Sequence, residues 1–351
     1  MAEAPALSVL VVTYNERELV ERCLPPLVEQ LEDGDELIVA DNASDDGTAE
    51  AVAKVAPRAT LIRMAANEGY MPACNAAAAR ARGDVLLTLD ADVLPAPGFC
   101  DAIRRPAAER RGWDAWMGLV TMAHGRLINT SGGVSHFTGL SWTGQVGEPA
   151  DAAPREPREV AFVSGACFAI ERAAWERDPG FAAEYFLYFD DVDWCFRARL
   201  RGGRLGLEPA AVVDHLYDFT KRQVKWRLLE RNRWATVIRT YPRELLLAVL
   251  PALLLTELVL PLVALRGGWL REKLLAHRDL VRWLPRLLRE RRAIQRHRAI
   301  SAAEFADHLT ADLDSPYLGA LGRSRVVAAG LRAYWAAVRR LLAPTRGSPL
   351  P

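Results

Sequence analysis

The stretch Val85-Leu86-Leu87-Thr88-Leu89-Asp90-Ala91-Asp92-Val93-Leu94-Pro95 decides the fold of this 351-residue chain. It is a nearly all-apolar run that ends on two carboxylates. Such a run predicts a strand buried on both faces of a sheet, because a half-exposed strand alternates polar and apolar residues. Asp90 and Asp92 then lie at its carboxyl end, where open α/β sheets bind ligands. Their oxygens suit Mg²⁺ or Mn²⁺ bound to substrate phosphates, although an isolated Asp-x-Asp is more often a plain turn.

The composition is that of an ordinary globular protein. Half of the residues are hydrophobic and a quarter are charged, and the length allows one large domain with an appendage, or two domains. The net charge is only +1, and we expect no nucleic-acid partner. Basic residues are nevertheless concentrated between positions 266 and 298, a segment that contains eleven Arg and Lys but only three acids.

The cysteines and the N-terminus bear on the cellular compartment. The five cysteines are widely spaced and form no CxxC pair, which predicts small buried side chains in a reducing compartment rather than disulfides. Residues 1–6 have no basic region followed by an apolar core. We therefore expect no signal peptide and a catalytic part that stays in the cytoplasm.

Strand and helix patterns alternate ahead of the opening stretch. Strands are expected at 7–15, 37–40 and 60–63, and helices at 16–31, 49–55 and 73–81. This rhythm predicts parallel strands joined by right-handed crossovers. The carboxyl ends of these strands, with residues 13–15, Asp41 and residues 90–92, are therefore expected to gather along one edge of the sheet.

That edge has the chemistry to bind a nucleotide. A carboxylate such as Asp41 can accept hydrogen bonds from a base or ribose, and an amide such as Asn67 can fix its neighbours. Each residue alone is more often a turn former, and it is their recurrence at successive strand ends that favours a site. The chain has no GxGxxG and no Walker lysine motif, which disfavours a dinucleotide enzyme or a P-loop NTPase.

The first 218 or so residues resemble the inverting family 2 glycosyltransferases of the GT-A fold, a group that includes bacterial rhamnosyltransferases. The resemblance rests on the order and spacing of six motifs: Val11-Val12-Thr13-Tyr14-Asn15, Val39-Ala40-Asp41-Asn42-Ala43-Ser44-Asp45-Asp46-Gly47, Asn67-Glu68-Gly69 with Asn75, Leu89-Asp90-Ala91-Asp92, Val163-Ser164-Gly165-Ala166, and Tyr188-Phe189-Asp190-Asp191-Val192-Asp193. It implies an α/β fold with a mixed, mainly parallel sheet flanked by helices.

The resemblance also implies roles for individual residues. Asp191 would be the catalytic base that deprotonates the acceptor hydroxyl, and Asp92 and His215 would hold a divalent cation, Mg²⁺ or Mn²⁺. The acceptor side would include Ser164, Gly165 and Asp190, where the family often has Glu at the last position. The nucleotide-sugar pocket would be lined by Thr13, Tyr14, Asn15, Asp41, Asn67, Gly69, Asn75, Asp90 and Ala91.

Several of these residues also have a purely structural interpretation. Asp190 could cap a helix over 192–200 with Asp193 as its capping partner, which leaves only Asp191 without a structural purpose. Gly165 could let an acceptor or a diphosphate approach the backbone, or could simply form a turn. His215, at the end of a strand expected over 211–215, could be a metal ligand or merely a hydrogen-bonded residue.

The middle of the chain is less regular in sequence. Glycine, serine, threonine and tryptophan are frequent between 125 and 147, and a proline-rich connection follows at 150–157. We interpret residues 104–157 as a variable, acceptor-facing part with a mobile loop. The sheet is then expected to resume at 160–163 and 166–170.

The C-terminal third, residues 219–351, is expected to be a helical region separate from the catalytic domain at 1–218. A basic helix at 219–239 precedes the segment 245–265, which is apolar except for Thr256 and Glu257 and contains Pro251 and Pro261. It is long enough to span a bilayer, but the acid and the prolines make an interfacial or re-entrant segment equally credible.

The sequence after this segment mixes arginines with leucines and tryptophans, as in an amphipathic helix on anionic lipid. A soluble helical appendage is the alternative. Residues 323–342 repeat the pattern more weakly, and 343–351 should fray.

We therefore expect a glycosyltransferase attached to the cytoplasmic face of the cell membrane. It would transfer a sugar, with rhamnose as the guess, from a nucleoside-diphosphate sugar to a hydroxyl of a lipid-linked glycan in cell-envelope polysaccharide synthesis. The alternatives are a sugar-phosphate nucleotidyltransferase, which normally has a glycine-rich basic loop where this chain has Thr13-Tyr14-Asn15-Glu16, and a catalytically silent nucleotide-binding membrane scaffold.

Overall fold

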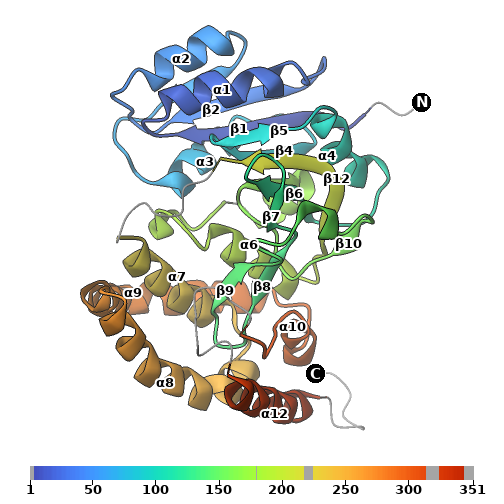
Figure 1. The fold of residues 1–351 in the computed structure, drawn as a ribbon. Coiled ribbons are helices and arrows are strands. Elements are labelled where there is room, and N and C mark those ends of the chain that lie inside the picture. The colour runs from blue at the N-terminus through green and yellow to red at the C-terminus, as the bar shows by residue number, and fades with distance from the viewer. Residues whose placement is uncertain (1–3, 179, 217–223, 314–323, 344–351) are drawn as a thin grey trace. The chain divides into compact units, whose positions relative to one another are not determined.

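The computed structural model describes residues 4–178, 180–216, 224–313 and 324–343. The chain forms two compact units (Figure 1). Unit 1 comprises Met1–Gly133, Thr143–Ala198 and Gly203–Lys221, and unit 2 comprises Val134–Trp142, Arg199–Gly202 and Arg222–Pro351. The second unit thus takes in two short segments from within the first 218 residues.

The parallel half of the sheet in unit 1 has the strand order β4-β1-β2-β3, with every neighbouring pair parallel. These strands are β1 (Leu7–Thr13), β2 (Glu36–Asp41), β3 (Thr60–Arg63) and β4 (Val85–Asp90), and the helices between them are α1 (Arg17–Val28), α2 (Thr48–Val55) and α3 (Tyr70–Ala78). Successive strands run outward from β1 to β3, and the chain then returns to place β4 on the other side of β1. Sheets of this kind bind ligands where the strand order reverses, here at the carboxyl ends of β1 and β4.

The other half of the sheet is mixed, in agreement with the expected fold class. Antiparallel β11 (Cys167–Glu171) lies between β4 and β6 (Ala115–Met122), and β12 (Leu205–His215) runs parallel to β6. The remaining elements of unit 1 are short: β5 (Val93–Pro95), β7 (Leu127–Thr130), β10 (Arg158–Glu159), α4 (Phe99–Ala108), α5 (Arg172–Arg177), α6 (Asp190–Leu200), η1 (Ala150–Ala152) and η2 (Ala183–Tyr185).

Three expectations from sequence need correction. The run 85–95 is two strands and not one, because the chain turns at Ala91 and Asp92 so that β5 can pair with β12. Residues 160–163 do not resume the sheet: β10 pairs with β12 just before them, and Phe162 forms only an isolated bridge to Gly133. The region 104–157 is not all variable loop, because β6 within it is an inner strand of the sheet.

Packing explains why β6 is an inner strand. Trp116 is fully buried, and its indole N–H donates to the carbonyl of Ile103 at 2.7 Å. The five cysteines are buried and free, as expected. At Gly118 the backbone of β12 comes so close that a Cβ would collide with the carbonyl of Ala211, next to a register shift in the β6–β12 pairing. This close approach sets the course of β12 toward its end at His215.

Unit 2 is built from helices. They are α7 (Val224–Thr240), α8 (Arg243–Arg266), α9 (Leu270–Arg296), α10 (Ala302–Ala306) and α12 (Arg325–Leu342), with a two-stranded ribbon of β8 (Gly133–Ser135) and β9 (Ser141–Thr143) beside them. The helix expected from residue 219 is described from Val224 onward, because 217–223 lie outside the described residues. Pro242 separates α7 from α8 as expected.

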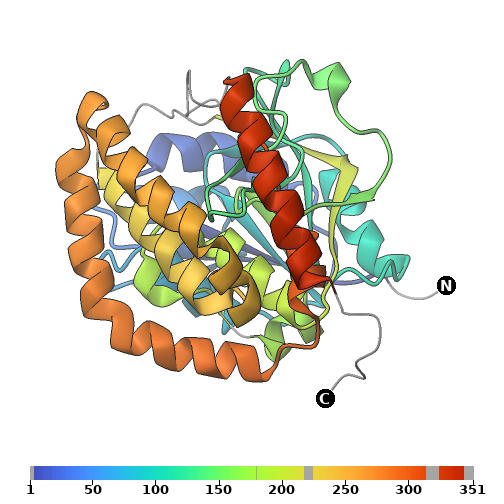
Figure 2. The same ribbon diagram turned by 90° about the horizontal axis from the view of Figure 1, so that it is seen from below.

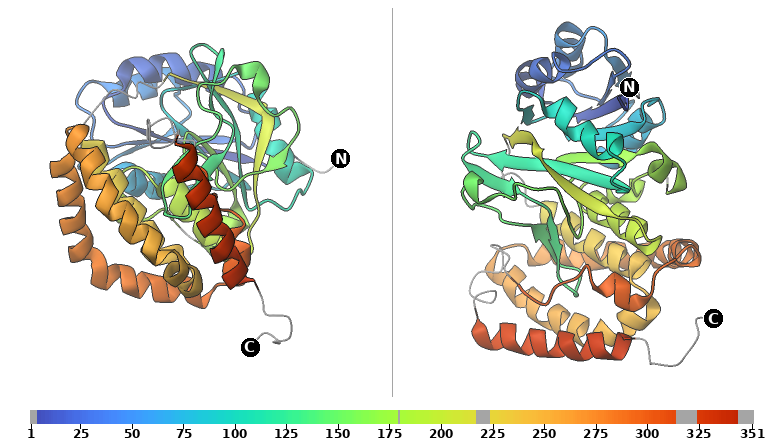
Figure 3. Two further views of the ribbon diagram at one scale, coloured as in Figure 1. Left: turned by 60° about the horizontal axis from the view of Figure 1, so that its bottom comes forward. Right: turned by 90° about the vertical axis from the view of Figure 1, so that its right-hand side faces the viewer.

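In the part of the chain that the structure describes, one helix, α8, is long enough and apolar enough to cross a membrane. Only 22% of its most apolar 18-residue stretch is buried. It lies beside α12 in unit 2 (Figures 2 and 3), where the Tyr334 hydroxyl donates to the carbonyl of Ala248 at 2.6 Å.

We expect Gly118→Ala to destabilise the protein by about 1–3 kcal/mol, because the added methyl group overpacks the β6–β12 contact. Denaturant unfolding followed by circular dichroism would measure this loss. The contrasting variant is Gly330→Ala, which adds a methyl group to an exposed helical position with open space around it. It should stabilise α12 by up to about 1 kcal/mol. Equal effects of the two substitutions would contradict the close approach of β12.

Candidate functional site

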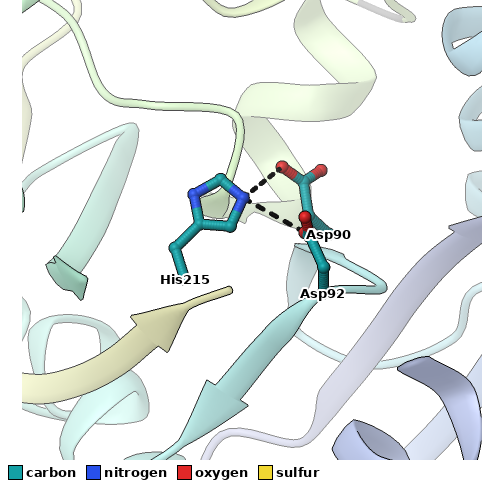
Figure 4. A group of neighbouring side chains, drawn as sticks. All are labelled: Asp90, Asp92 and His215. Carbon is teal, nitrogen blue, oxygen red and sulfur yellow. Dashed lines mark ion pairs between the residues drawn. The ribbon is translucent and has the colours of Figure 1, made fainter. Parts of the chain in front are cut away.

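Two carboxylates and an imidazole meet at the carboxyl ends of β4 and β12 (Figure 4). The His215 Nε2 atom lies 3.1 Å from Asp92 Oδ1 and 3.9 Å from Asp90 Oδ2. Two backbone features bring them together: β5 pairs antiparallel with the end of β12, and the N–H of Leu216 donates to the carbonyl of Asp92 at 2.9 Å. Asp92 and His215, the predicted metal ligands, are therefore neighbours.

These three side chains fit a divalent cation. One ligand atom from each lies within 4.8 Å of the others, and carboxylate oxygens with an imidazole nitrogen are a donor set that Mn²⁺ and Mg²⁺ accept. Burial by itself would favour neutral His215, but the hydrogen bond to Asp92 and the charges of both carboxylates outweigh it and raise the pKa of the imidazole. A bound cation would thus compete with a proton on His215.

The carboxylates here repel one another. Burial, followed by the charge of Asp92, raises the pKa of Asp90 to about 6. A further acid that the sequence reasoning did not single out, Glu16, has its pKa raised to about 7 by burial and by Asp92. Glu16 follows directly after the predicted residues Tyr14 and Asn15, so its position at the same strand end was a usable signal. The excess of negative charge favours a cation at this point.

The nucleotide-side residues cluster at the ends of β1 and β2. Thr13 Oγ1 donates to Asp41 Oδ1 at 3.2 Å, and both side chains are buried. Asp41 Oδ2 also accepts from the backbone N–H of Ser44 at 3.3 Å. In the strand register Thr13 is opposite Asp41, and Val12 is opposite Asp90. Asp41 and Asp90 therefore flank β1 at two strand spacings, about 10 Å apart.

Exposed polar groups lie next to this pair. Tyr14 is 37% exposed, and Asn15 has a left-handed backbone with φ of 55°, which Asn adopts more readily than most residues. The Asn15 side chain accepts from the N–H of Asp45 at 3.0 Å and so ties the end of β1 to the loop after β2. Ala91, which lies between Asp90 and Asp92 in the sequence, is buried. Its small side chain leaves room beside the two carboxylates.

Asn67 and Gly69 shape a neighbouring turn. Asn67 Oδ1 accepts from Asn42 Nδ2 at 2.9 Å and from the N–H of Gly69 at 3.0 Å. Gly69 has a φ of 99°, and a Cβ there would lie 2.5 Å from the carbonyl oxygen of Phe186. Only glycine fits at this position, which explains the motif without a direct contact to a ligand.

The Asn75 side chain, which the resemblance assigns to the nucleotide-sugar pocket, is hydrogen-bonded to the backbone of Phe181. Its Nδ2 donates to the carbonyl of Phe181 at 3.0 Å, and its Oδ1 accepts from the N–H of Phe181 at 2.8 Å. Both ends of the amide thus hold the loop that leads toward α6.

Asp191 is held beside the end of β4 through Gly165. Its Oδ2 accepts from the N–H of Gly165 at 3.1 Å, and its Oδ1 accepts from the N–H of Val192 at 2.7 Å. The next carbonyl, that of Ala166, accepts from the N–H of Asp90 at 3.4 Å. Burial raises the pKa of Asp191 to about 6, although these backbone N–H groups lower it.

Asp190 and the 164–165 turn complete the acceptor-side set. Burial and the adjacent charge of Asp191 raise the pKa of Asp190 well above its ordinary value. A Cβ on Gly165 would lie 3.5 Å from Asp190 Oδ2 and 3.9 Å from Asp191 Oδ2, so the backbone there lies against both carboxyl groups. Ser164 Oγ accepts from the N–H of Ala166 at 3.4 Å, which makes this a hydrogen-bonded turn.

The capping interpretation of Asp190 and Asp193 is wrong in its details. Helix α6 begins at Asp190 and not at Val192. Asp193 is fully buried, and its carboxylate accepts from Tyr185 Oη at 3.2 Å and from Arg197 Nε at 2.9 Å. It therefore fastens the helix to η2 and closes an i,i+4 ion pair.

Three aromatic residues just before α6 adopt positive φ angles. They are Phe186, Tyr188 and Phe189, with φ of 69°, 70° and 67°. Bulky side chains rarely adopt this conformation, and such strain concentrates at functional sites. The positive φ angles direct the backbone so that the carboxyl groups of Asp190 and Asp191 lie next to Gly165. Sequence alone gave no signal of this strain, because it depends on the tertiary contacts of the loop.

A second acidic group in unit 2, Glu230, Glu257 and His277, has a similar spacing but different surroundings. Lys273 Nζ lies 2.9 Å from both Glu230 Oε1 and Glu257 Oε2, and Arg233 Nη2 lies 2.6 Å from Glu230 Oε1. Two buried cations already neutralise the carboxylates. This group is therefore not a metal site.

Known proteins resemble this chain in sequence and in fold. Residues 8–176 match the family described as "Glycosyl transferase family 2". Two strains of Mycobacterium tuberculosis, CDC 1551 / Oshkosh and H37Rv, have a protein named N-acetylglucosaminyl-diphospho-decaprenol L-rhamnosyltransferase that is 29% identical to this chain over 231 residues. The match covers 60% of this chain and 75% of that protein.

Among solved structures, GalNAc-T7 with UDP, GalNAc and Mn²⁺ aligns with a TM-score of 0.57 and 17% identity, over 69% of this chain. This chain spans about half of that one, 49% of its length. The structure of S. aureus TarS 1–349 aligns over 95% of this chain and 89% of its own, with a TM-score of 0.50 and 17% identity. At these identities the likeness concerns the fold, which is that of GT-A glycosyltransferases.

We expect Asp92→Asn and His215→Gln each to weaken Mn²⁺ binding by roughly tenfold or more, because each removes one of three converging ligands. Free Mn²⁺ measured by electron paramagnetic resonance during a titration would report this. His277→Gln is the matched control, since it removes the imidazole of the other cluster and should leave Mn²⁺ affinity unchanged. Weakened binding in His277→Gln with normal binding in His215→Gln would contradict the assignment.

Proposed function

Because the chain carries a family 2 glycosyl transferase domain, we propose that it transfers a sugar with inversion from a nucleoside-diphosphate sugar to an acceptor hydroxyl. The observation that supports this best is the convergence of Asp90, Asp92 and His215 at the sheet edge where β2 ends at Asp41, with Asp191 held at the start of α6 through the Gly165 turn beside the end of β4. It combines a place for a metal-bound diphosphate with a separately held carboxylate. A glycosyltransferase needs both.

In this proposal each carboxylate has its own task. Asp41 accepts hydrogen bonds from the nucleoside, next to Thr13 and the exposed Tyr14 and Asn15. Asp92 and His215, with Asp90, would hold a divalent cation, Mg²⁺ or Mn²⁺, which when bound neutralises the charge that grows on the departing diphosphate.

Asp191 accepts the proton of the acceptor hydroxyl, and that oxygen then attacks the anomeric carbon from the face opposite the diphosphate. The two backbone N–H groups that bind Asp191 fix its orientation, so that the carboxylate needs no reorganisation during the step. Burial and the charge of Asp191 raise the pKa of Asp190 well above its ordinary value, which favours its neutral form beside the base.

The finer assignments follow the relative from M. tuberculosis. Its printed name combines L-rhamnose transfer with an acceptor carried on a decaprenol diphosphate. By this likeness we propose rhamnose as the donor sugar and a lipid-linked glycan as the acceptor. The choice of dTDP as the nucleotide and of the cell envelope as the destination rests on the family resemblance alone. With an acceptor of this kind, we propose that the enzyme acts at the cytoplasmic face of the cell membrane.

Replacing Asp191 by Asn should lower the transfer rate by about 10²- to 10⁴-fold, because the amide cannot accept the proton. Binding of the donor nucleotide, measured by calorimetry with Mn²⁺ present, should stay close to that of the unchanged protein. Asp101→Asn, an exposed acid on α4, is the control for the lost charge. Full transfer by Asp191→Asn would contradict the base assignment. Donor binding without any transfer by the unchanged chain would instead favour a catalytically silent nucleotide-binding scaffold.

The transfer rate should fall as the pH drops through about 6, because only ionised Asp191 can act as a base and burial raises its pKa to that value. Above this range the rate should level off. The acidic limb of a plot of kcat/KM against pH tests this. Donor affinity is measured at the same pH values as a control, because the pKa of Asp90 is also about 6. A limb near 4, the ordinary value of a free aspartate, would show that Asp191 is not buried as described.

A further inference from the structure

Helix α8 is apolar on both of its faces, and only one of them is covered. Leu245, Val249, Leu253, Leu260 and Ala264 are buried against the rest of unit 2. The opposite face carries an exposed stripe of leucines, each 41–73% exposed, at positions Leu247, Leu250, Leu254, Leu258, Leu262 and Leu265. Contiguous exposed apolar surface of this kind marks an interaction site.

Helix α9, next to α8 in unit 2 (Figure 2), has an exposed face of mixed character. Leu274 and Val281 are 62% and 70% exposed, and the exposed arginines Arg278, Arg282 and Arg289 lie between or beside them. Leucines with flanking arginines fit the boundary between headgroups and acyl chains of an anionic leaflet, where long cationic side chains reach the phosphates. A second copy of this chain would instead bring arginine toward arginine.

Glu257 fastens α8 to its neighbours on the covered side. Its carboxylate accepts from Trp234 Nε1 at 3.0 Å, from Lys273 Nζ at 2.9 Å and from His277 Nε2 at 2.9 Å, and it pairs with Arg233 at 2.5 Å. The partners come from α7 and α9. Arg233 and Lys273 are only 2% and 1% exposed, so neither cation has water to replace this carboxylate.

This attachment is incompatible with α8 crossing a bilayer. In a spanning helix Glu257 would lie near the middle of the hydrocarbon, since it is the fifteenth of the 24 residues. Either the carboxylate would leave Arg233 and Lys273 behind as two buried cations with only the carboxylate of Glu230 between them, or both cations would enter the hydrocarbon with it. A helix lying in the interface keeps every one of these contacts and still buries its leucine stripe.

We propose that unit 2 docks on an anionic phospholipid leaflet through the exposed faces of α8 and α9, with α8 lying in the plane of the interface. This deepens the proposed function, on whose membrane location it rests, by stating the geometry of attachment. The lipid partner is recognised by two features together: acyl chains that receive the leucine stripe, and anionic headgroups that pair with the arginines of α9.

The depth of α8 tests the geometry. An environment-sensitive fluorophore is attached to the full chain at Leu247→Cys, Leu258→Cys or Leu265→Cys, with Arg58→Cys in unit 1 as the reference; the five native cysteines are buried. Vesicles of phosphatidylcholine and phosphatidylglycerol carry a quencher either near the headgroups or near the chain ends. All three α8 positions should be quenched by the shallow quencher, and Arg58→Cys by neither. Deep quenching at Leu258→Cys with shallow quenching at the other two would overturn the proposal in favour of a spanning helix.

Co-sedimentation with the same vesicles tests the chemistry of the surface. The double variant Leu254→Glu, Leu258→Glu should lose at least nine-tenths of its vesicle binding. Arg282→Gln with Arg289→Gln should lower binding to phosphatidylglycerol vesicles several-fold, whereas the matched pair Arg58→Gln with Arg105→Gln, which removes the same charge from exposed sites of unit 1, should not. Binding that is equal on pure phosphatidylcholine would overturn the headgroup contribution. Dimerisation that the Leu254→Glu, Leu258→Glu variant abolishes, without vesicle binding by the unchanged chain, would overturn the lipid partner.

A donor-binding measurement on the same samples separates this inference from the proposed function. Calorimetry with Mn²⁺ and the nucleoside diphosphate should give the same affinity for the unchanged chain and for Leu254→Glu, Leu258→Glu. Normal donor binding without vesicle binding overturns the docking surface alone. Vesicle binding without donor binding overturns the transferase proposal and leaves the docking surface standing.

Discussion

Crowded negative charge at the strand ends of unit 1 is the constraint on which the site depends. Asp90 and Asp92 are one residue apart, and Asp190 and Asp191 are brought toward Asp90 through the Gly165 turn. Two unit charges 4 Å apart repel by about 4 kcal/mol near a protein surface. The sheet holds them together regardless. Burial raises the pKa of both Asp90 and Asp191, and for Asp90 the charge of Asp92 adds to this effect.

The same crowding separates the tasks of the four acids. Asp92 shares its charge with His215, which makes this side of the cluster the natural place for a cation. Asp191 has backbone N–H donors that keep it ionisable, whereas Asp190 is driven toward its neutral form. We propose that burial and hydrogen bonding give these chemically equal side chains their different roles, as cation ligands, as the base and as a neutral neighbour of the base.

Features local in the sequence could be predicted, and features made by distant contacts could not. The apolar run before Asp90 and the alternation of strands and helices predicted the parallel half of the sheet and the edge where Thr13, Asp41 and Asp90 meet. Strand β6 was not predicted, because Gly118 and the glycine-rich sequence after it resemble a loop. Its burial comes from β11 and β12 on either side. The hydrogen bonds of Asn75 could not be predicted either, because their partner, Phe181, is more than a hundred residues away.

Unit 2 shows the same limit in another form. In the sequence, Glu257 is an isolated acid in an apolar helix, at a cost of about 2.5–3.5 kcal/mol for insertion at the centre of a bilayer. In the structure it is the shared partner of Arg233, Trp234, Lys273 and His277. The hydrogen bonds from His277 and the two cations outweigh burial and hold the pKa of Glu257 well below its usual range. The length and hydropathy of a segment do not reveal that its one acid is bonded to side chains of neighbouring helices.

The central claim is that the strand-end acids of unit 1 bind a metal-borne diphosphate beside Asp191. A crystal structure of the full chain with Mn²⁺ and a nucleoside-diphosphate sugar tests it most directly, with data collected at a wavelength where manganese scatters anomalously. The account predicts an anomalous peak in contact with Asp92 and His215, the diphosphate on that peak, and the anomeric carbon facing Asp191. A peak elsewhere in the molecule, or a sugar bound away from Asp191, would contradict it.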